Sequence, residues 1–297
     1  LGEPVGAAGG LALVAGTLSC AWTMLGVVRT ATNRTGSAEN WILSGIFWAV
    51  AAGALHLAIT IRMAIGSAPL AYGTWNQALI YAMLFGFIGS FIFAVSARAV
   101  RGFLLLKPMY ERVNFVSFWL LQAGLATQVI GRFADMDLKV ASTGLILCSV
   151  GSVLFVFAVR VLEGPSGPIR RFPVGYDRFG LFVRTAYGWL IVGALLLILQ
   201  SLENNDVTDI LPPPVSLPVM HVFTIGFVTL LIIGVASKIL PVFEGSDIRW
   251  PRLMDIAFVL VNTSVVLRVA GGFSTSTPPG PPGGGRRTTS RAVGGRY

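Results

Sequence analysis

The chain has 297 residues, of which 54% are hydrophobic and 12% are charged, whereas a soluble domain is about a quarter charged. This composition excludes a soluble protein with a single membrane anchor, because the apolar residues are spread along the whole length. The formal net charge of +9 does not indicate nucleic-acid binding, since the Arg and Lys residues lie mostly between the apolar runs.

Eight apolar runs are long enough to cross a bilayer, for which a helix needs about 20 apolar residues. The runs are continuous rather than alternating, which argues against a membrane β-barrel and leaves helices as the spanning elements. We therefore predict an all-α fold, a polytopic integral membrane helix bundle with about eight transmembrane helices over residues 1–273. The predicted spans are Ala7–Val28, Trp41–Met63, Asn76–Ala97, Val113–Ile130, Val140–Val161, Phe179–Gln200, Pro218–Lys238 and Leu253–Ala270.

The two ends of the chain differ from those expected of a complete membrane protein. The first residue is Leu rather than Met, and residues 274–297 consist largely of Pro, Gly, Arg and Thr. Such a composition cannot bury enough apolar surface to fold. We expect a fragment that ends in a disordered low-complexity tail, and the abrupt change after Phe273 suggests that this tail is not native sequence.

The loops predict the orientation of the chain. The first, third, fifth and seventh loops carry most of the basic residues, and the second, fourth and sixth carry only Arg62, Arg132 and Lys139. An excess of Lys and Arg marks cytoplasmic loops. The odd-numbered loops are therefore expected to face the cytoplasm, with lipid of the bilayer as the surrounding partner and no nucleic acid.

An internal repeat appears when the chain is shifted against itself by 140 residues. Gly86 and Phe87 then match Gly226 and Phe227, and three consecutive spans match at this one ungapped offset. The repeat predicts two units of four helices with the same orientation, at about residues 1–133 and 134–273. In spans four and eight, Gln122 and Asn262 occupy equivalent positions, where we expect hydrogen bonds between helices.

The two histidines are the main candidates for chemistry. His221 lies near the start of the seventh span and His56 lies in the second, so both are expected at a similar depth. A neutral imidazole is a good ligand for haem iron or copper, and Met63 and Met220 are nearby thioethers. The alternative is that each histidine hydrogen-bonds a neighbouring helix or the lipid headgroups, and that the methionines only fill space.

Other residue classes give weaker indications. Cys20 and Cys148 lack the spacing of a metal site and are expected to pack as small apolar residues. Glycines, with the series Gly144, Cys148, Gly151 and Ser152, are expected to let helices approach closely. No acidic residue lies in the middle of a span, which argues against a proton-coupled transporter.

The stretch HVFTIGFVTLLIIGVASKILPVFEG, residues 221–245, resembles the recurring segment of the NnrS family. The shared pattern is His221, Gly226, Phe227, Gly234, Lys238, Pro241 and Phe243. Members of that family are polytopic proteins that hold haem and copper and protect against nitric oxide stress. The pattern is also similar to a helix of haem–copper oxidase subunit I, whose twelve helices form arcs of four.

The resemblance implies a membrane protein with haem or copper, or both, held by His221 as the main ligand and His56 as the second. It also implies a redox partner or a small gaseous ligand, and a place in a bacterial inner (plasma) membrane. An oxygen-reducing centre is not expected, because the oxidases use six histidine ligands and this chain has two. Two alternatives remain: a small-solute transporter or channel, and a structural membrane subunit without a cofactor.

Overall fold

The computed structural model describes residues 2–30, 36–66, 73–134, 136–164, 178–205, 216–246 and 248–274, and every regular element in them is a helix. Eight helices are long and apolar enough to cross a membrane, which confirms the predicted all-α, multi-pass fold. The helices extend past the predicted apolar cores, because a helix continues into the headgroup region, where polar residues such as Glu39 and Asn40 are tolerated. The predicted tail lies, from residue 275 onward, outside the described residues.

The first four spans lie in the N-terminal half of the chain, and the third is built from several helical segments. The first, second and fourth spans are α1 (Gly2–Thr30), α2 (Gly36–Gly66) and α6 (Glu111–Phe133). The third span is made of α3 (Thr74–Tyr81), η1 (Ala82–Ile88), α4 (Gly89–Val95), η2 (Ser96–Val100) and α5 (Arg101–Leu104). The elements η1 and η2 are π-helices, whose wider turns are uncommon inside α-helices.

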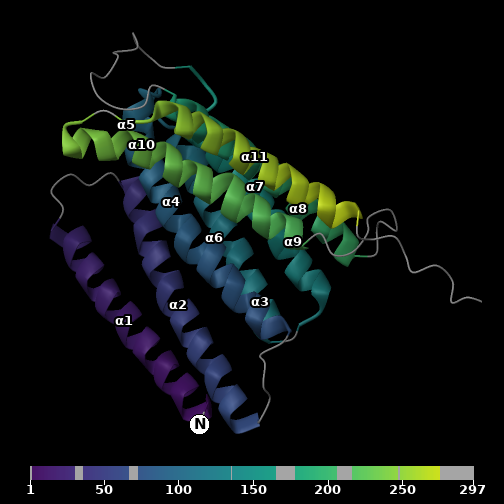
Figure 1. The fold of residues 1–297 in the computed structure, drawn as a ribbon. Coiled ribbons are helices and arrows are strands. Elements are labelled where there is room, and N and C mark those ends of the chain that lie inside the picture. The colour runs from purple at the N-terminus through teal and green to yellow at the C-terminus, as the bar shows by residue number, and fades with distance from the viewer. Residues whose placement is uncertain are drawn as a thin grey trace, which may run out of the picture.

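The C-terminal half supplies the other four spans in a similar order. The fifth, sixth and eighth spans are α7 (Leu138–Val159), α8 (Phe179–Asn204) and α11 (Pro251–Ser274). The seventh span is made of α9 (Ser216–His221), the π-helix η3 (Val222–Thr229) and α10 (Leu230–Glu244). In Figure 1, α1 and α2 lie along one side of the bundle, and α10 and α11 run across its upper part. Helices that follow one another in the chain therefore mostly pack side by side.

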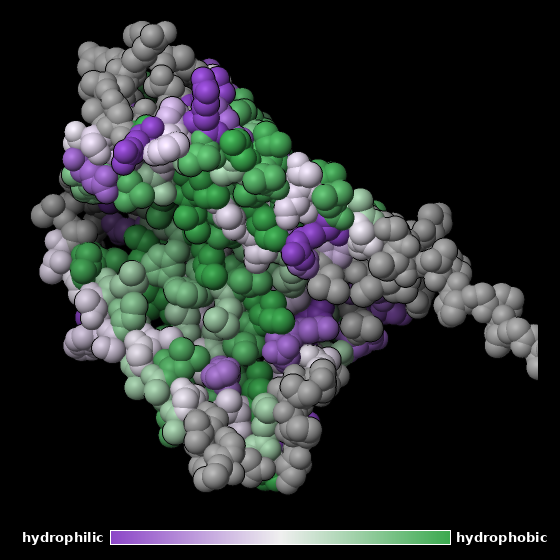
Figure 2. All heavy atoms as spheres, in the orientation of Figure 1, coloured by the Kyte–Doolittle hydropathy of each residue, from purple (hydrophilic) through white to green (hydrophobic). Residues whose placement is uncertain are grey.

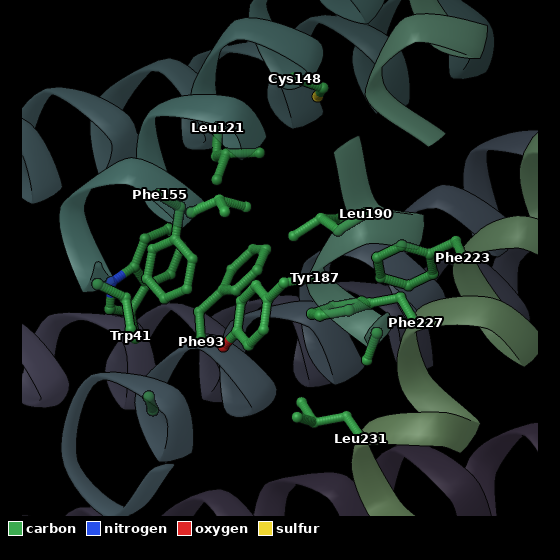
Figure 3. Packing of buried hydrophobic residues seen from close by; sticks show 14 of the residues in the cluster. Trp41, Phe93, Leu121, Cys148, Phe155, Tyr187, Leu190, Phe223, Phe227 and Leu231 are labelled. Carbon is green, nitrogen blue, oxygen red and sulfur yellow. The ribbon is translucent and has the colours of Figure 1, made fainter. Parts of the chain in front are cut away.

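A cluster of aromatic rings packs at the centre of the bundle. The Trp41 ring meets Phe93, Phe118 and Phe155 edge to face, at centroid distances of 5.0, 4.9 and 5.5 Å. These residues come from α2, α4, α6 and α7. Figure 3 shows Tyr187 and Phe227, both of the second half, beside Phe93, and the Phe85 and Phe223 rings lie 4.2 Å apart. Such ring contacts are worth about 0.5–1.5 kcal/mol each beyond area burial.

The backbones of α6 and α7 approach each other closely. A Cβ atom on Gly124 would lie 2.7 Å from Cys148 Sγ and 2.8 Å from the Gly144 carbonyl oxygen, and the Ser117 hydroxyl donates to the Gly151 carbonyl at 2.7 Å. This confirms that the predicted series of small residues brings helices together. Within a bilayer such contact is needed, because exclusion of water cannot drive helix association there.

One local arrangement occurs in both halves. Trp48 Nε1 donates to Gln122 Oε1, and Trp189 Nε1 donates to Asn262 Oδ1, each at 2.7 Å, so both amides bond between helices as expected. A Cβ atom on Gly86 or Gly226 would lie 2.6 Å or 2.9 Å from the corresponding Trp Cγ. These glycines lie in η1 and η3, which begin 140 residues apart, at the offset of the sequence repeat. The division into units at about residue 133 stays a prediction.

The end of the seventh span differs from the sequence-based expectation. The predicted apolar span ended at Lys238, and α10 continues through Lys238 and Pro241 to Glu244. Proline lacks one backbone donor and does not by itself end a helix whose next turn is still held by other bonds. Lys238 is 4% exposed, and its Nζ lies 5.5 Å from the centroid of the Phe179 ring, so its charge is stabilised within the bundle.

Ion pairs gather at one end of the bundle, which we call the basic end. The Lys107 Nζ lies 3.3 Å and the Arg160 Nη2 lies 2.7 Å from Glu163 Oε2, and Arg178 Nη1 lies 3.0 Å from Asp255 Oδ1. The hydrogen-bonded Arg160 guanidinium lowers the pKa of the Glu163 carboxyl below its ordinary value. The other end, where α6 and α8 finish, is called the opposite end below.

The Glu163 network should give the protein a pH-dependent share of its stability. Because the folded-state pKa is lowered, that share is fully present at neutral pH and is lost as the pH falls below about 4.3 and through the folded-state pKa. Thermal unfolding in detergent should show Glu163→Gln with a lower Tm at pH 7, and the deficit should vanish at acidic pH. Glu244→Gln is the control, and an unchanging Glu163→Gln deficit would contradict the prediction.

Gly124→Ala should destabilise the protein, because the added methyl group has no room between α6 and α7. Overpacking of this kind costs about 1–3 kcal/mol, and the Tm of the detergent-solubilised protein should fall. Gly16→Ala on α1 is the matched control, since a Cβ atom there would meet nothing within 4 Å. Equal Tm values for both variants would show that the two helices can move apart at no cost.

Candidate functional site

His221 stands where the seventh span changes its helical geometry. It is the last residue of α9 and directly precedes the π-helix η3, whose turns Thr224 and Thr229 support by donating to the Met220 and Thr224 carbonyls. Its side chain is half-buried at the opposite end of the bundle. Single π-helical turns inside α-helices are frequent at functional sites, so this location fits a functional histidine.

Arg268 of α11 is the contact that determines the state of His221. Its Nη1 lies 3.0 Å from His221 Nε2. A guanidinium can only donate, so His221 Nε2 accepts through its lone pair and the imidazole is neutral, with its proton on Nδ1. A neutral imidazole is the form that binds metals, but the lone pair of Nε2 already accepts this hydrogen bond. A metal at Nε2 therefore requires the exposed Arg268 side chain to turn away.

His56 lies elsewhere in the bundle. It is half-buried on α2, whose extensive contacts are with α1, the third span and α6. The helix segment that carries His221 packs instead on η3, α8 and α11. The sequence suggested that the two rings are within reach of each other if their helices are neighbours, and these helices do not form an extensive contact. The two histidines are therefore best treated as two separate candidates.

The available donors suit some metal groups better than others. In the part of the chain that the structure describes, no three His, Cys, Asp or Glu side chains come together in a group that could hold a metal ion. A copper ion needs several protein ligands. Haem brings four nitrogen ligands of its own and needs only one imidazole from the protein. A single neutral imidazole such as His221 fits haem and does not by itself complete a copper site.

Two hollows in the described surface are apolar and lie away from both histidines. One of about 320 Å³ lies between α1, α2, α4 and α10, and another of about 400 Å³ continues between α4 and α10 past Phe91, Ile92 and Ile232. Figure 2 shows a broad hydrophobic surface on this face. Such a lining is expected where a membrane-spanning protein faces hydrocarbon.

Two further charged residues were not selected as site residues from the sequence. Arg268 was not considered at all, and Arg132 was assigned to the fourth loop and its flanks. The structure places Arg132 inside α6 with only 7% of its surface exposed. In the sequence, the available signal for a buried Arg132 was its position directly after an apolar run. That position does not tell which side of the helix is buried, because this depends on how the neighbouring helices pack.

These features define a multi-pass helical membrane protein with a half-buried histidine at a π-helical turn. The family model described as NnrS protein matches residues 177–282, about a third of the chain. The match covers α8, the seventh span and α11, and so includes His221, Arg268 and the Trp189–Asn262 bond. No curated protein and no solved structure matches the chain.

Replacing Arg268 should make His221 more reactive, because the Nε2 lone pair then loses its hydrogen bond. A bond of this kind is worth about 1 kcal/mol, so Arg268→Gln should speed the carbethoxylation of His221 by diethylpyrocarbonate about fivefold. Mass spectrometry of the peptides gives both rates, with His56 in the same sample as the internal control. Equal His221 rates in both proteins would show that Arg268 does not occupy this nitrogen.

Proposed function

We propose that this protein is an NnrS-type membrane protein that binds haem or copper through His221, with His56 as the second candidate ligand. The observation that carries the proposal is the position of a neutral, half-buried imidazole at the π-helical turn, inside the stretch that matches the NnrS family model. The resemblance of residues 221–245 to that family supplies the link to nitric oxide or nitrosative stress.

The donor set favours haem over copper for His221. The described residues offer this imidazole without a cluster of further His, Cys, Asp or Glu ligands, and one imidazole is enough for the axial position of a haem. Arg268 would then serve a second purpose. A guanidinium released from His221 can pair with a carboxylate, and haem carries carboxylate side chains.

Purified protein from haem-replete cells should show a Soret band, and His221→Ala should remove it. The readout is the ratio of Soret to protein absorbance in detergent, with copper measured in the same samples by elemental analysis. His56→Ala separates two arrangements, since a shared group needs both histidines, whereas separate sites leave the band intact. Thr143→Val, at an exposed position of α7, is the control. A colourless and copper-free wild-type protein would refute the proposal.

A small-solute transporter or channel is the second candidate, and a different observation favours it. Charged side chains inside membrane spans are costly and often line the path of an ion, and Arg132 is such a residue. Flux through proteoliposomes of the wild-type protein that is lost in Arg132→Gln would support this alternative. A structural subunit without a cofactor would be supported if His56→Ala and His221→Ala together changed neither assembly nor phenotype.

A further inference from the structure

Arg132 is a buried charge whose hydrogen-bond partners are all neutral. Its Nε donates to Gln128 Oε1 at 3.0 Å, its Nη1 donates to Gln77 Oε1, and its guanidinium carbon lies 5.1 Å from the centroid of the Tyr81 ring. Within the described ranges, no carboxylate forms an ion pair with it. The carbonyl end of α6 favours a cation there, but a buried charge without a counter-charge remains costly.

Polar atoms without partners lie around this charge. Tyr81 is 3% exposed and Gln200 is 6% exposed, and neither the Tyr81 hydroxyl nor Gln200 Oε1 has a hydrogen-bond partner. The Tyr81 hydroxyl lies within reach of both Arg132 and Gln200. Buried polar atoms are paired in most proteins, and each exception calls for an explanation such as a bound ligand.

The surroundings hold a second arginine and a further buried donor. Arg62, at the end of α2, lies with its guanidinium carbon 4.5 Å from the centroid of the Trp75 ring, and Trp75 packs on Phe133 at 4.4 Å. Phe133 is the neighbour of Arg132 in α6, so both arginines stand on one side of the opposite end. Trp75 Nε1 is another buried donor without a partner. Donors and positive charge in one place favour an anion.

We propose that Arg132, Tyr81 and Gln200 form a binding site for a small inorganic anion, a halide or a small oxyanion. The anion accepts hydrogen bonds from the guanidinium N–H groups that do not donate to Gln128 or Gln77, and from the Tyr81 hydroxyl. The Gln200 carboxamide closes the site from α8, because an amide can present its NH₂ group by turning about its last bond. This site is independent of the histidines and of any haem or copper.

Gln77 controls access to the site. It is exposed at the start of α3, and its carbonyl oxygen accepts from Arg132 Nη1 between the guanidinium and the outside of the bundle. An anion reaches Arg132 from this side by replacing that oxygen. A glutamate in this position would bring a permanent carboxylate to the guanidinium, so Gln77→Glu should fill the site from within the chain.

The test measures the Tm of the full chain in detergent against increasing sodium chloride, nitrite or nitrate, with sodium gluconate keeping the ionic strength constant. A ligand that binds only the folded protein raises Tm with concentration. At least one of the three anions should raise the Tm of the wild-type protein. Tyr81→Phe should weaken the apparent affinity about tenfold, because it removes one hydrogen bond to a charged group.

Two variants distinguish an anion site from a structural role of the same residues. If the Tyr81 hydroxyl were only an unpaired buried group, Tyr81→Phe would keep the full anion response and leave Tm equal or higher. Gln77→Glu should raise Tm without added anion and lose the response to anions. Because Gln77→Glu leaves Arg132 in place, it tests the site even if Arg132→Gln fails to fold.

The control is Arg249→Gln, which removes an exposed arginine stacked on Trp250 at the basic end and should leave the anion response unchanged. The proposal is overturned if no anion raises the wild-type Tm above that in gluconate. It is equally overturned if Tyr81→Phe and Gln77→Glu respond to the anions as the wild-type protein does.

Discussion

The close contact of α6 with α7 is the interaction on which the arrangement of this bundle depends. These two helices are the last of the first four spans and the first of the next four, so their contact joins the two halves. Gly124, Gly144 and Gly151 allow the approach, since a side chain at any of them would collide with backbone or with Cys148, Gln128 or Leu121. Because lipid provides no hydrophobic driving force, complementary shape and a few hydrogen bonds hold the helices together.

With the two halves joined in this way, their aromatic side chains meet at the centre. In Figure 3, Phe93 of the first half lies beside Tyr187 and Phe227 of the second, and Trp41 packs on Phe93. The rings also form a continuous row, from Tyr81 through Phe85 to Phe223, at centroid distances of 5.4 and 4.2 Å. This row leads from the surroundings of Arg132 to a residue only two positions from His221. The two candidate sites therefore share one packed interior.

The polar groups inside the bundle fall into two sets. Most are paired between helices, as Trp48 is with Gln122 and Trp189 with Asn262, and these pairs fix the positions of the π-helical segments. The others are charged or unpaired groups, among them Arg132 at the opposite end, with its neutral partners. Because unpaired polar groups are costly in a low-dielectric interior, the second set is where function is to be sought.

Composition and apolar run length alone determined that the chain is a membrane bundle with eight helical spans, since hydrocarbon leaves the backbone few other ways to satisfy its hydrogen bonds. The pattern around Gly226 and Pro241 likewise pointed to the NnrS family before any packing was known. The tertiary structure decided which polar residues meet. Arg268 reaches His221 across 47 positions, and Arg132 reaches Gln77 across 55. Such contacts depend on the rotation and tilt of each helix about its neighbours, and apolar faces that differ little from one another leave that rotation undetermined by sequence alone.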